Sequence, residues 1–162
     1  MAAKGLHLGI DVNNFLLRKE IMNQYLHIIT LGVKDLSSAR AFYTEGLGWK
    51  PSSASHEGIT FYQTGGVVLS LFPLEALAED ASVPAERSGF SGMAFAYNTR
   101  SEREVDEIIS DLKSKGVTIL KPPQKAFWGG YHAYFADPDG NPWEVAFNPF
   151  FSFDNSGNLA LE

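Results

Sequence analysis

The chain has 162 residues, 44% of them apolar and none of them cysteine, which fits one folded domain and excludes disulfides and thiolate metal sites. Its net charge of −6 repels a phosphate backbone, so we expect no nucleic-acid partner. No apolar run approaches the roughly 18 residues of a membrane span and no export signal is recognisable, so we expect a cytoplasmic protein with no membrane partner.

Residues 1–21 do not share the regular pattern that follows them, and we expect the natural chain to start near Met22. Two interpretations of this leader stay open: a segment derived from an expression vector, or an amphipathic docking segment. Residues 22–150 are expected to form the folded domain, and residues 151–162 a C-terminal hairpin extension or tail.

The first half of the domain, about residues 25–73, begins with an apolar, β-branched strand near 25–33. Asp35 is expected to cap a helix that ends at the glycines around Gly46. Three short strands follow in the prediction, at about 49–53, 59–63 and 67–72.

The second half, about residues 91–148, repeats this order after a polar surface connection at 74–90. A strand near 92–99 leads to a capping box formed by Ser101 and Glu104, and the helix that it starts ends at Gly116. The last three predicted strands lie at about 117–120, 130–136 and 142–147.

Two tandem β-α-β-β-β modules of this kind predict an α+β fold with curved mixed sheets. Each sheet is covered by its helix on one face, and the uncovered faces are expected to curl around a cup that serves as the ligand site. Phe150, Phe151 and Phe153 concentrate apolar area after the last strand, so we expect a homodimer.

The stretches ITLGVKDLSSARAFYTEGLGW and YFADPDGNPWEVAFNP resemble the vicinal oxygen chelate superfamily, which contains glyoxalases, bleomycin-resistance proteins and dioxygenases. The resemblance spans about residues 25–149 and implies a divalent metal ion held in the cup by His, Glu or Gln. The matching positions here carry Ile28, Ser70, Gly92 and Glu144. Because only Glu144 among them is a good ligand, we expect no metal centre and no other cofactor.

Glu144 and His132 are the candidate catalytic residues. If Ala136 pairs with Asn141 across the intervening turn, His132 faces away from Glu144, whereas a register one residue different places them side by side. A Glu–His pair can act in acid-base catalysis, and the alternative is a half-exposed histidine without a role. The choice between the two registers stays open.

Glu144 is also expected to bind the ligand, by accepting a hydrogen bond from it in the cup, and the alternative is a carboxylate that faces water at the mouth of the cup. Four further residues are candidate ligand-binding residues. Trp128 and Tyr131 flank two glycines and are expected to form an aromatic wall, although the same segment also fits an edge-strand bulge packed with core aromatics. Thr30 and Ser70 are small and polar and are expected to form the floor of the cup.

We therefore expect a protein that binds a small aromatic or cationic molecule in the cup without the family metal centre. Two enzymatic alternatives remain: a metal-dependent lyase or dioxygenase with displaced ligands, or a metal-free isomerase that uses Glu144 and His132 as base and acid.

Overall fold

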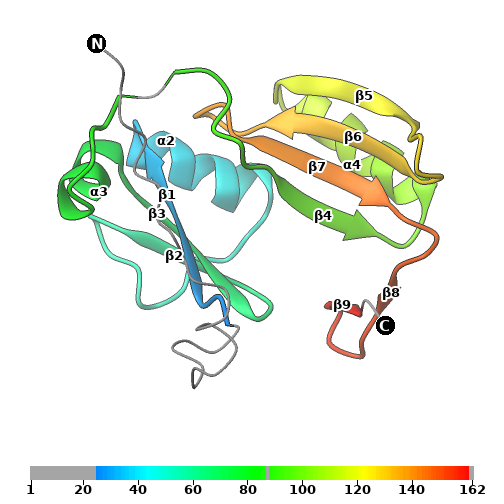
Figure 1. Ribbon diagram of the computed structural model, residues 1–162, viewed down its shortest axis with the longest axis horizontal. Coiled ribbons are helices and arrows are strands. Elements are labelled where there is room, and N and C mark those ends of the chain that lie inside the picture. Colours follow the sequence, from blue (N-terminus) through cyan, green and yellow to red (C-terminus); the bar gives the residue numbers. More distant parts are fainter. Residues whose placement is uncertain (1–24, 87, 161–162) are drawn as a thin grey trace, which may run out of the picture.

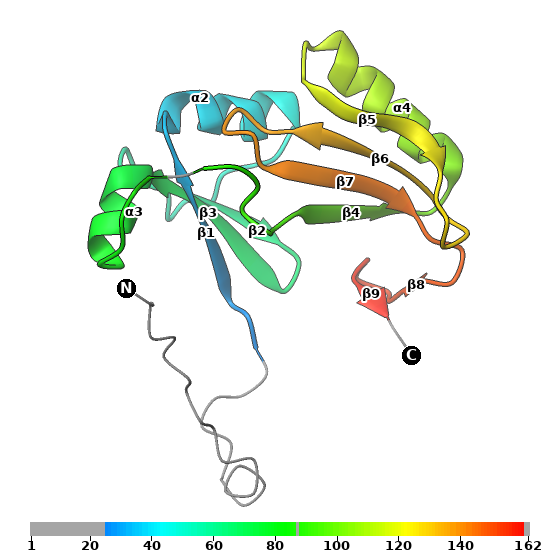
Figure 2. The same ribbon diagram turned by 45° about the horizontal axis from the view of Figure 1, so that its top comes forward.

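The computed structural model describes residues 25–86 and 88–160, so the expectations for the leader 1–21 and for Met22 lie outside the described residues. Two sheets lie side by side, the first on the left and the second on the right of Figure 1. The helices α2 and α4 run along the upper side of these sheets in Figure 2. In the described part of the chain, no helix is long and apolar enough to cross a membrane.

The first module forms a three-stranded sheet in the order β1-β3-β2. β1 is parallel to β3, and β2 is antiparallel to it. Its elements are β1 (Ile28–Val33), α2 (Leu36–Ala41), the π-helical turn η1 (Phe42–Gly46), β2 (Thr60–Thr64) and β3 (Val67–Pro73).

The second module forms a four-stranded sheet in the order β4-β7-β6-β5, with β4 parallel to β7 and the other neighbours antiparallel. Its elements are β4 (Phe95–Thr99), α4 (Glu102–Ser114), β5 (Ile119–Lys125), β6 (Tyr131–Ala136) and β7 (Pro142–Phe147). The helix α3 (Leu74–Asp80) occupies the connection between the modules and packs on β1 and β3. The α+β fold with two repeated modules is therefore confirmed.

Both helices begin where their capping residues predict. Asp35 Oδ1 accepts hydrogen bonds from two backbone amides of the first turn of α2. Ser101 Oγ accepts from the backbone N–H of Glu104 at the start of α4. Gly116, with φ of +77°, follows the end of α4 in the left-handed conformation that glycine adopts without strain.

The prediction of a strand at 49–53 is wrong, because this segment is irregular in the structure. Ser52 N–H donates to the carbonyl of Phe61 at 2.8 Å, and Phe61 N–H donates to Ser55 Oγ at 2.9 Å. The segment therefore runs beside β2, but one of its bonds uses a side chain, and no regular ladder forms. The first module consequently has three strands instead of four.

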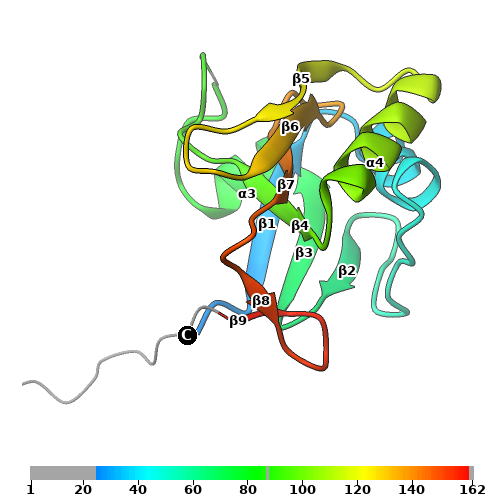
Figure 3. The ribbon, with the colours of Figure 1, turned by 90° about the vertical axis from the view of Figure 1, so that its right-hand side faces the viewer.

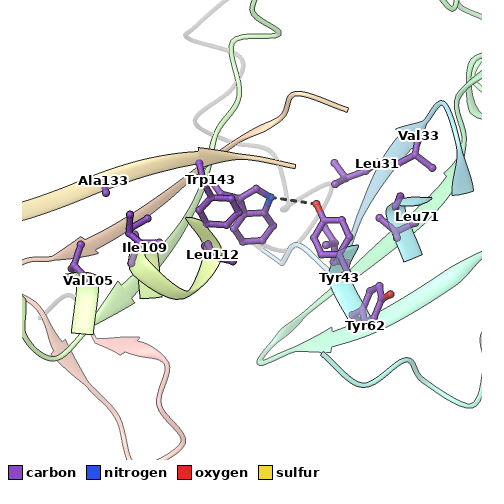
Figure 4. Close-up of a cluster of buried hydrophobic side chains, with 14 residues drawn as sticks. Leu31, Val33, Tyr43, Tyr62, Leu71, Val105, Ile109, Leu112, Ala133 and Trp143 are labelled. Atoms are coloured by element: carbon purple, nitrogen blue, oxygen red, sulfur yellow. Dashed lines mark hydrogen bonds between the residues drawn. The ribbon is translucent and has the colours of Figure 1, made fainter. Parts of the chain in front are cut away.

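The two modules share one apolar core, shown in Figure 4. Tyr43 of η1 is fully buried and reaches the second module, where Trp143 Nε1 donates to its hydroxyl at 3.3 Å. The same hydroxyl donates to Asp137 Oδ2 at 2.8 Å. Burial and the adjacent Asp137 charge raise the pKa of Tyr43 well above its ordinary value, so it stays a neutral donor.

A short hairpin follows the second module and lies below it in Figure 3. It consists of β8 (Ser152–Phe153) and β9 (Leu159–Ala160). Asp154 closes the turn, since its carboxylate accepts from Ser156 N–H and from two groups of Asn158. These hydrogen bonds lower the pKa of Asp154.

Candidate functional site

His132 and Glu144 lie side by side on the face of the second sheet that is turned away from α4. Ala136 pairs with Pro142, so Glu144 stands opposite Tyr134 and His132 is its diagonal neighbour. This is the second of the two registers considered above. The loop 137–141 sets it, because this loop is one residue longer than the expected turn 137–140, and Asp137 N–H donates to the carbonyl of Asn141 within it.

The histidine is hydrogen-bonded at both ring nitrogens. Nδ1 lies 2.7 Å from Glu144 Oε1, and Nε2 lies 3.0 Å from Lys121 Nζ. A carboxylate can only accept and an ammonium can only donate, so His132 donates from Nδ1 and accepts at Nε2. Its side chain is only 9% exposed. Lys121, His132 and Glu144, here called the cluster, therefore form one chain of hydrogen bonds.

Aromatic side chains surround the cluster. The Trp128 ring meets the His132 ring edge-on at 5.8 Å between centroids, and the Tyr134 ring does so at 5.6 Å. Gly130 makes room for the indole, because a Cβ atom there would lie 1.6 Å from Trp128 Cζ3. Burial, followed by the charge of Glu144 and a hydrogen bond to it, raises the pKa of Tyr134.

A cavity of about 530 Å³ opens beside Tyr134. It is bounded by strand, turn and connecting segments, with apolar or small side chains throughout: Gly89, Phe90, Ala94, Leu120, Tyr134, Gly140 and Pro142. A space of this size accommodates a small organic molecule next to the cluster.

Tyr131 lies on the opposite face of β6 from His132, because successive side chains of a strand point to opposite faces. Its hydroxyl donates to Asp106 of α4 at 2.9 Å, so it belongs to the helix side of the sheet. The expectation that Tyr131 and Trp128 form one wall is corrected, and only Trp128 lies beside His132.

Thr30 and Ser70 are paired with each other on the first sheet. They stand opposite each other in the parallel ladder of β1 and β3, and Ser70 Oγ donates to Thr30 Oγ1 at 2.7 Å. Ser70 is fully buried. α3 packs over the same face, since a Cβ on Gly32 would lie 2.9 Å from Leu74 Cδ1. Neither hydroxyl lines the cavity beside Tyr134.

The four family positions do not supply a metal-binding set. Ile28 offers no lone pair and stands opposite Val68, and the Ser70 hydroxyl is committed to Thr30. Glu144 is bonded to His132, whose second nitrogen already accepts from an ammonium. Among the described residues, no three His, Cys, Asp or Glu side chains are grouped to hold an ion. The side chains present therefore do not fit the divalent metal of the family.

A larger cavity, of about 1120 Å³, lies between the modules on the other side of the sheets. Its wall includes the aromatic residues Trp49, Tyr62, Phe95 and Trp143, and the C-terminal hairpin borders it through Phe153 and Leu159. It contains none of the six candidate residues.

Two residues of the site were not foreseen. Tyr134 follows His132 by two positions, and residues two apart in a strand share a face. The sequence therefore contained the signal that places Tyr134 beside His132. Lys121 could not be found in this way, because two register shifts in β5 decide which face it occupies. The pair Pro122-Pro123 is the sequence signal of that irregularity.

Comparison with known proteins identifies the family. The model of the Glyoxalase/Bleomycin resistance protein/Dioxygenase superfamily matches residues 25–145. A glyoxalase-related enzyme from Fulvimarina pelagi is 39% identical with a TM-score of 0.77, and the match covers 85% of this chain and 97% of that one. A glyoxalase/bleomycin resistance protein/dioxygenase from Nocardioides is 26% identical with a TM-score of 0.68, covering 83% and 89%.

A lactoylglutathione lyase from Agrobacterium tumefaciens is also similar, at 26% identity and a TM-score of 0.60, with 77% of this chain and 94% of that chain covered. The matched range contains both repeated modules and most of the cluster-bearing sheet, including Lys121, His132 and Glu144. The chain belongs to the glyoxalase/bleomycin resistance protein/dioxygenase superfamily.

Proposed function

We propose that this protein binds a small aromatic molecule on the cluster face of the second sheet, without the metal centre of its family. The observation that carries the proposal is the state of His132: both ring nitrogens are engaged, by Glu144 at 2.7 Å and by Lys121 at 3.0 Å. A metal ion would have to displace Lys121 from Nε2 or break the bond to Glu144, and the described residues offer no third ligand.

The surroundings of the cluster support an aromatic ligand more than a cationic one. Trp128 and Tyr134 offer ring edges and faces, and apolar side chains line the adjacent cavity. The net charge of −6 suggests a cation, but the Lys121 ammonium lies in the cluster itself and repels one at short range. The aromatic alternative is therefore the one we propose.

Thermal-shift measurements in 1 mM EDTA test binding without metal. We expect at least one member of a panel of aromatic metabolites and drugs to raise the melting temperature, because a ligand at 100 times its Kd adds about 2.7 kcal/mol to the free energy of unfolding. The variant Tyr134→Ala should lose this shift because Tyr134 lines the cavity, whereas Phe127→Ala, at a fully exposed position, should keep it. Stabilisation that requires added metal would contradict the proposal.

The His132–Glu144 hydrogen bond favours a second candidate, a metal-free acid-base isomerase. The carboxylate orients the imidazole through Nδ1, an arrangement that leaves Nε2 as the atom able to take or give a proton. Lys121 occupies Nε2 in this structure, so a substrate would have to replace it there. Binding of a ligand without turnover favours the first candidate.

We also propose that the protein is a homodimer in the cytoplasm. Large apolar side chains are exposed near the start of β1 and after β7, among them Leu26 at 60% and Phe150 at 78%. A second copy would cover this area. Light scattering coupled to size exclusion should give about twice the chain mass of 17.8 kDa at micromolar concentration, and a monomer alone would refute the dimer.

A further inference from the structure

The position of Lys121 results from an irregular edge strand. The pairing of β5 with β6 runs from Ile119 opposite Phe135 to Lys121 opposite Tyr134. β5 thus uses two residues where β6 uses one, which is the signature of a β-bulge with Leu120 as the extra residue. In a regular ladder Lys121 would stand opposite Ala133 and face α4. The bulge turns it onto the cluster face.

A second register shift follows immediately. β5 advances by three residues from Lys121 to Gln124, whereas β6 moves by two, from Tyr134 to His132. Pro122 and Pro123 fill this shift, and proline is tolerated there because β5 is the edge strand of the sheet that residues 25–86 and 88–160 form. Irregularities on both sides of one lysine are costly for a strand, and bulges are concentrated next to binding and catalytic sites.

The Lys121 ammonium has donors to spare. It carries three N–H groups, and one of them is directed to His132 Nε2. No Asp or Glu among the described residues lies within 4 Å of Lys121 Nζ, whereas Lys125 on the same strand is paired with Glu102 and Lys115 with Asp111. The nearest carboxylate of the cluster, Glu144, is bonded to His132 instead.

Apolar surface lies close to this ammonium. The Tyr134 ring centroid is 5.9 Å from Lys121 Nζ, and Tyr134 together with the bulged Leu120 lines the cavity of about 530 Å³. Lys121 is half-buried and does not itself line this apolar space, but two of the residues that do, Leu120 and Tyr134, are its chain neighbour and its partner across the ladder. A ligand that joins a flat apolar body to one anionic group would match both parts.

We propose that Lys121 is a ligand-binding residue that selects small aromatic carboxylates. This inference rests on the proposed function and names the ligand class for the same site. The two remaining N–H groups of Lys121 donate to the ligand carboxylate, and its ring lies against Tyr134 and Leu120. A neutral amide of the same shape loses the charge-assisted hydrogen bonds, and a cationic amine is repelled by the ammonium.

The test is a comparison of three probes built on one scaffold: 2-naphthoate, 2-naphthamide and 2-naphthylmethylammonium. Affinities are measured by isothermal titration calorimetry at pH 8, where an ordinary imidazole is neutral. Wild-type protein should bind the carboxylate at least tenfold more tightly than the amide. Lys121→Met should bring that ratio to about one, and Lys121→Arg should keep most of it. The matched control Lys125→Met should retain the full ratio.

The outcomes separate the two claims. A ratio near one in wild-type protein, or a ratio unchanged in folded Lys121→Met, overturns the role of Lys121 and leaves small-molecule binding intact. Absence of binding by all three probes at millimolar concentration overturns the role of Lys121 when the thermal-shift panel does give a ligand, and it overturns both claims when that panel gives none. Circular dichroism of the Lys121 variants verifies that their fold is retained, and Lys121→Gln, for which the expected ratio is also about one, replaces Lys121→Met should the methionine variant fail to fold.

Discussion

Replacing Asp137 with Ala is expected to lower the free energy of unfolding by about 3–5 kcal/mol. Asp137 is 5% exposed, and its carboxylate accepts four hydrogen bonds. Their donors are the Tyr43 hydroxyl, the Asn141 side chain, and the backbone N–H groups of Asp139 and Asn141. Truncation leaves these donors without an acceptor in or near the core, at roughly 1–3 kcal/mol for each one that stays buried.

The effect is large because Asp137 connects the two modules. Its partner Tyr43 lies in η1 of the first module, and Trp143 of the second module donates to the same hydroxyl, as Figure 4 shows. Domains of this size are stable by about 5–15 kcal/mol in total, so the variant loses a substantial part of its stability. Urea unfolding followed by tryptophan fluorescence measures the change.

Asp139→Ala is the matched control in the same turn. Among the described residues, its side chain accepts one hydrogen bond, from the backbone N–H of Lys34 at an exposed position, so its loss should cost about 1 kcal/mol or less. The loss of stability in Tyr43→Phe should lie between the losses in the Asp137 and Asp139 variants, because Asp137 Oδ2 keeps its hydrogen bond from Asn141. Equal stability of the Asp137 and Asp139 variants would show that the buried carboxylate does not join the modules.

The sequence predicted the repeated modules because their boundary residues act locally. Asp35 and Ser101 cap the two helices through hydrogen bonds to neighbouring backbone amides, and Gly116 ends α4. The segment 49–53 was wrongly predicted as a strand because its apolar residues serve another purpose. Trp49 packs its ring against Tyr43 and Tyr62 in the core shared by the modules.

The site was predicted only in part, for a different physical reason. Glu144 and His132 were identified, but their proximity depends on a register that a single residue in the turn changes. That residue is Asn141, which belongs to the loop because its backbone N–H and its side chain both donate to the carboxylate of Asp137. The same carboxylate accepts from the distant Tyr43 hydroxyl, a contact that the local sequence does not reveal. A bulge determines the face of the sheet on which Lys121 lies. Strand prediction assumes that side chains alternate between the two faces, and this alternation fails at a bulge.

The second prediction of large effect concerns metal content. A divalent ion bound as in the family needs at least three side-chain ligands, and the described residues provide no such group. The Lys121 ammonium already donates to the lone pair of His132 Nε2, and a metal ion would need the same lone pair. A site of this kind should neither retain an ion during purification nor take one up at micromolar concentration.

The residues themselves suggest which variants to compare. Glu144→Gln removes the charge that any bound cation would require, and Lys121→Met removes the ammonium that competes with a metal for His132. Wild-type protein and Glu144→Gln should therefore contain equally little metal. In Lys121→Met the ammonium no longer covers His132 Nε2, so this variant shows whether the uncovered nitrogen takes up metal.

The most direct test is inductively coupled plasma mass spectrometry of wild-type protein purified without chelator and dialysed against Ni, Zn, Fe and Mn. We predict less than about 0.1 equivalent of each metal per chain, the same in Glu144→Gln, and a melting temperature unchanged by EDTA. About one equivalent of a metal in the wild type that is lost in Glu144→Gln would contradict the metal-free site.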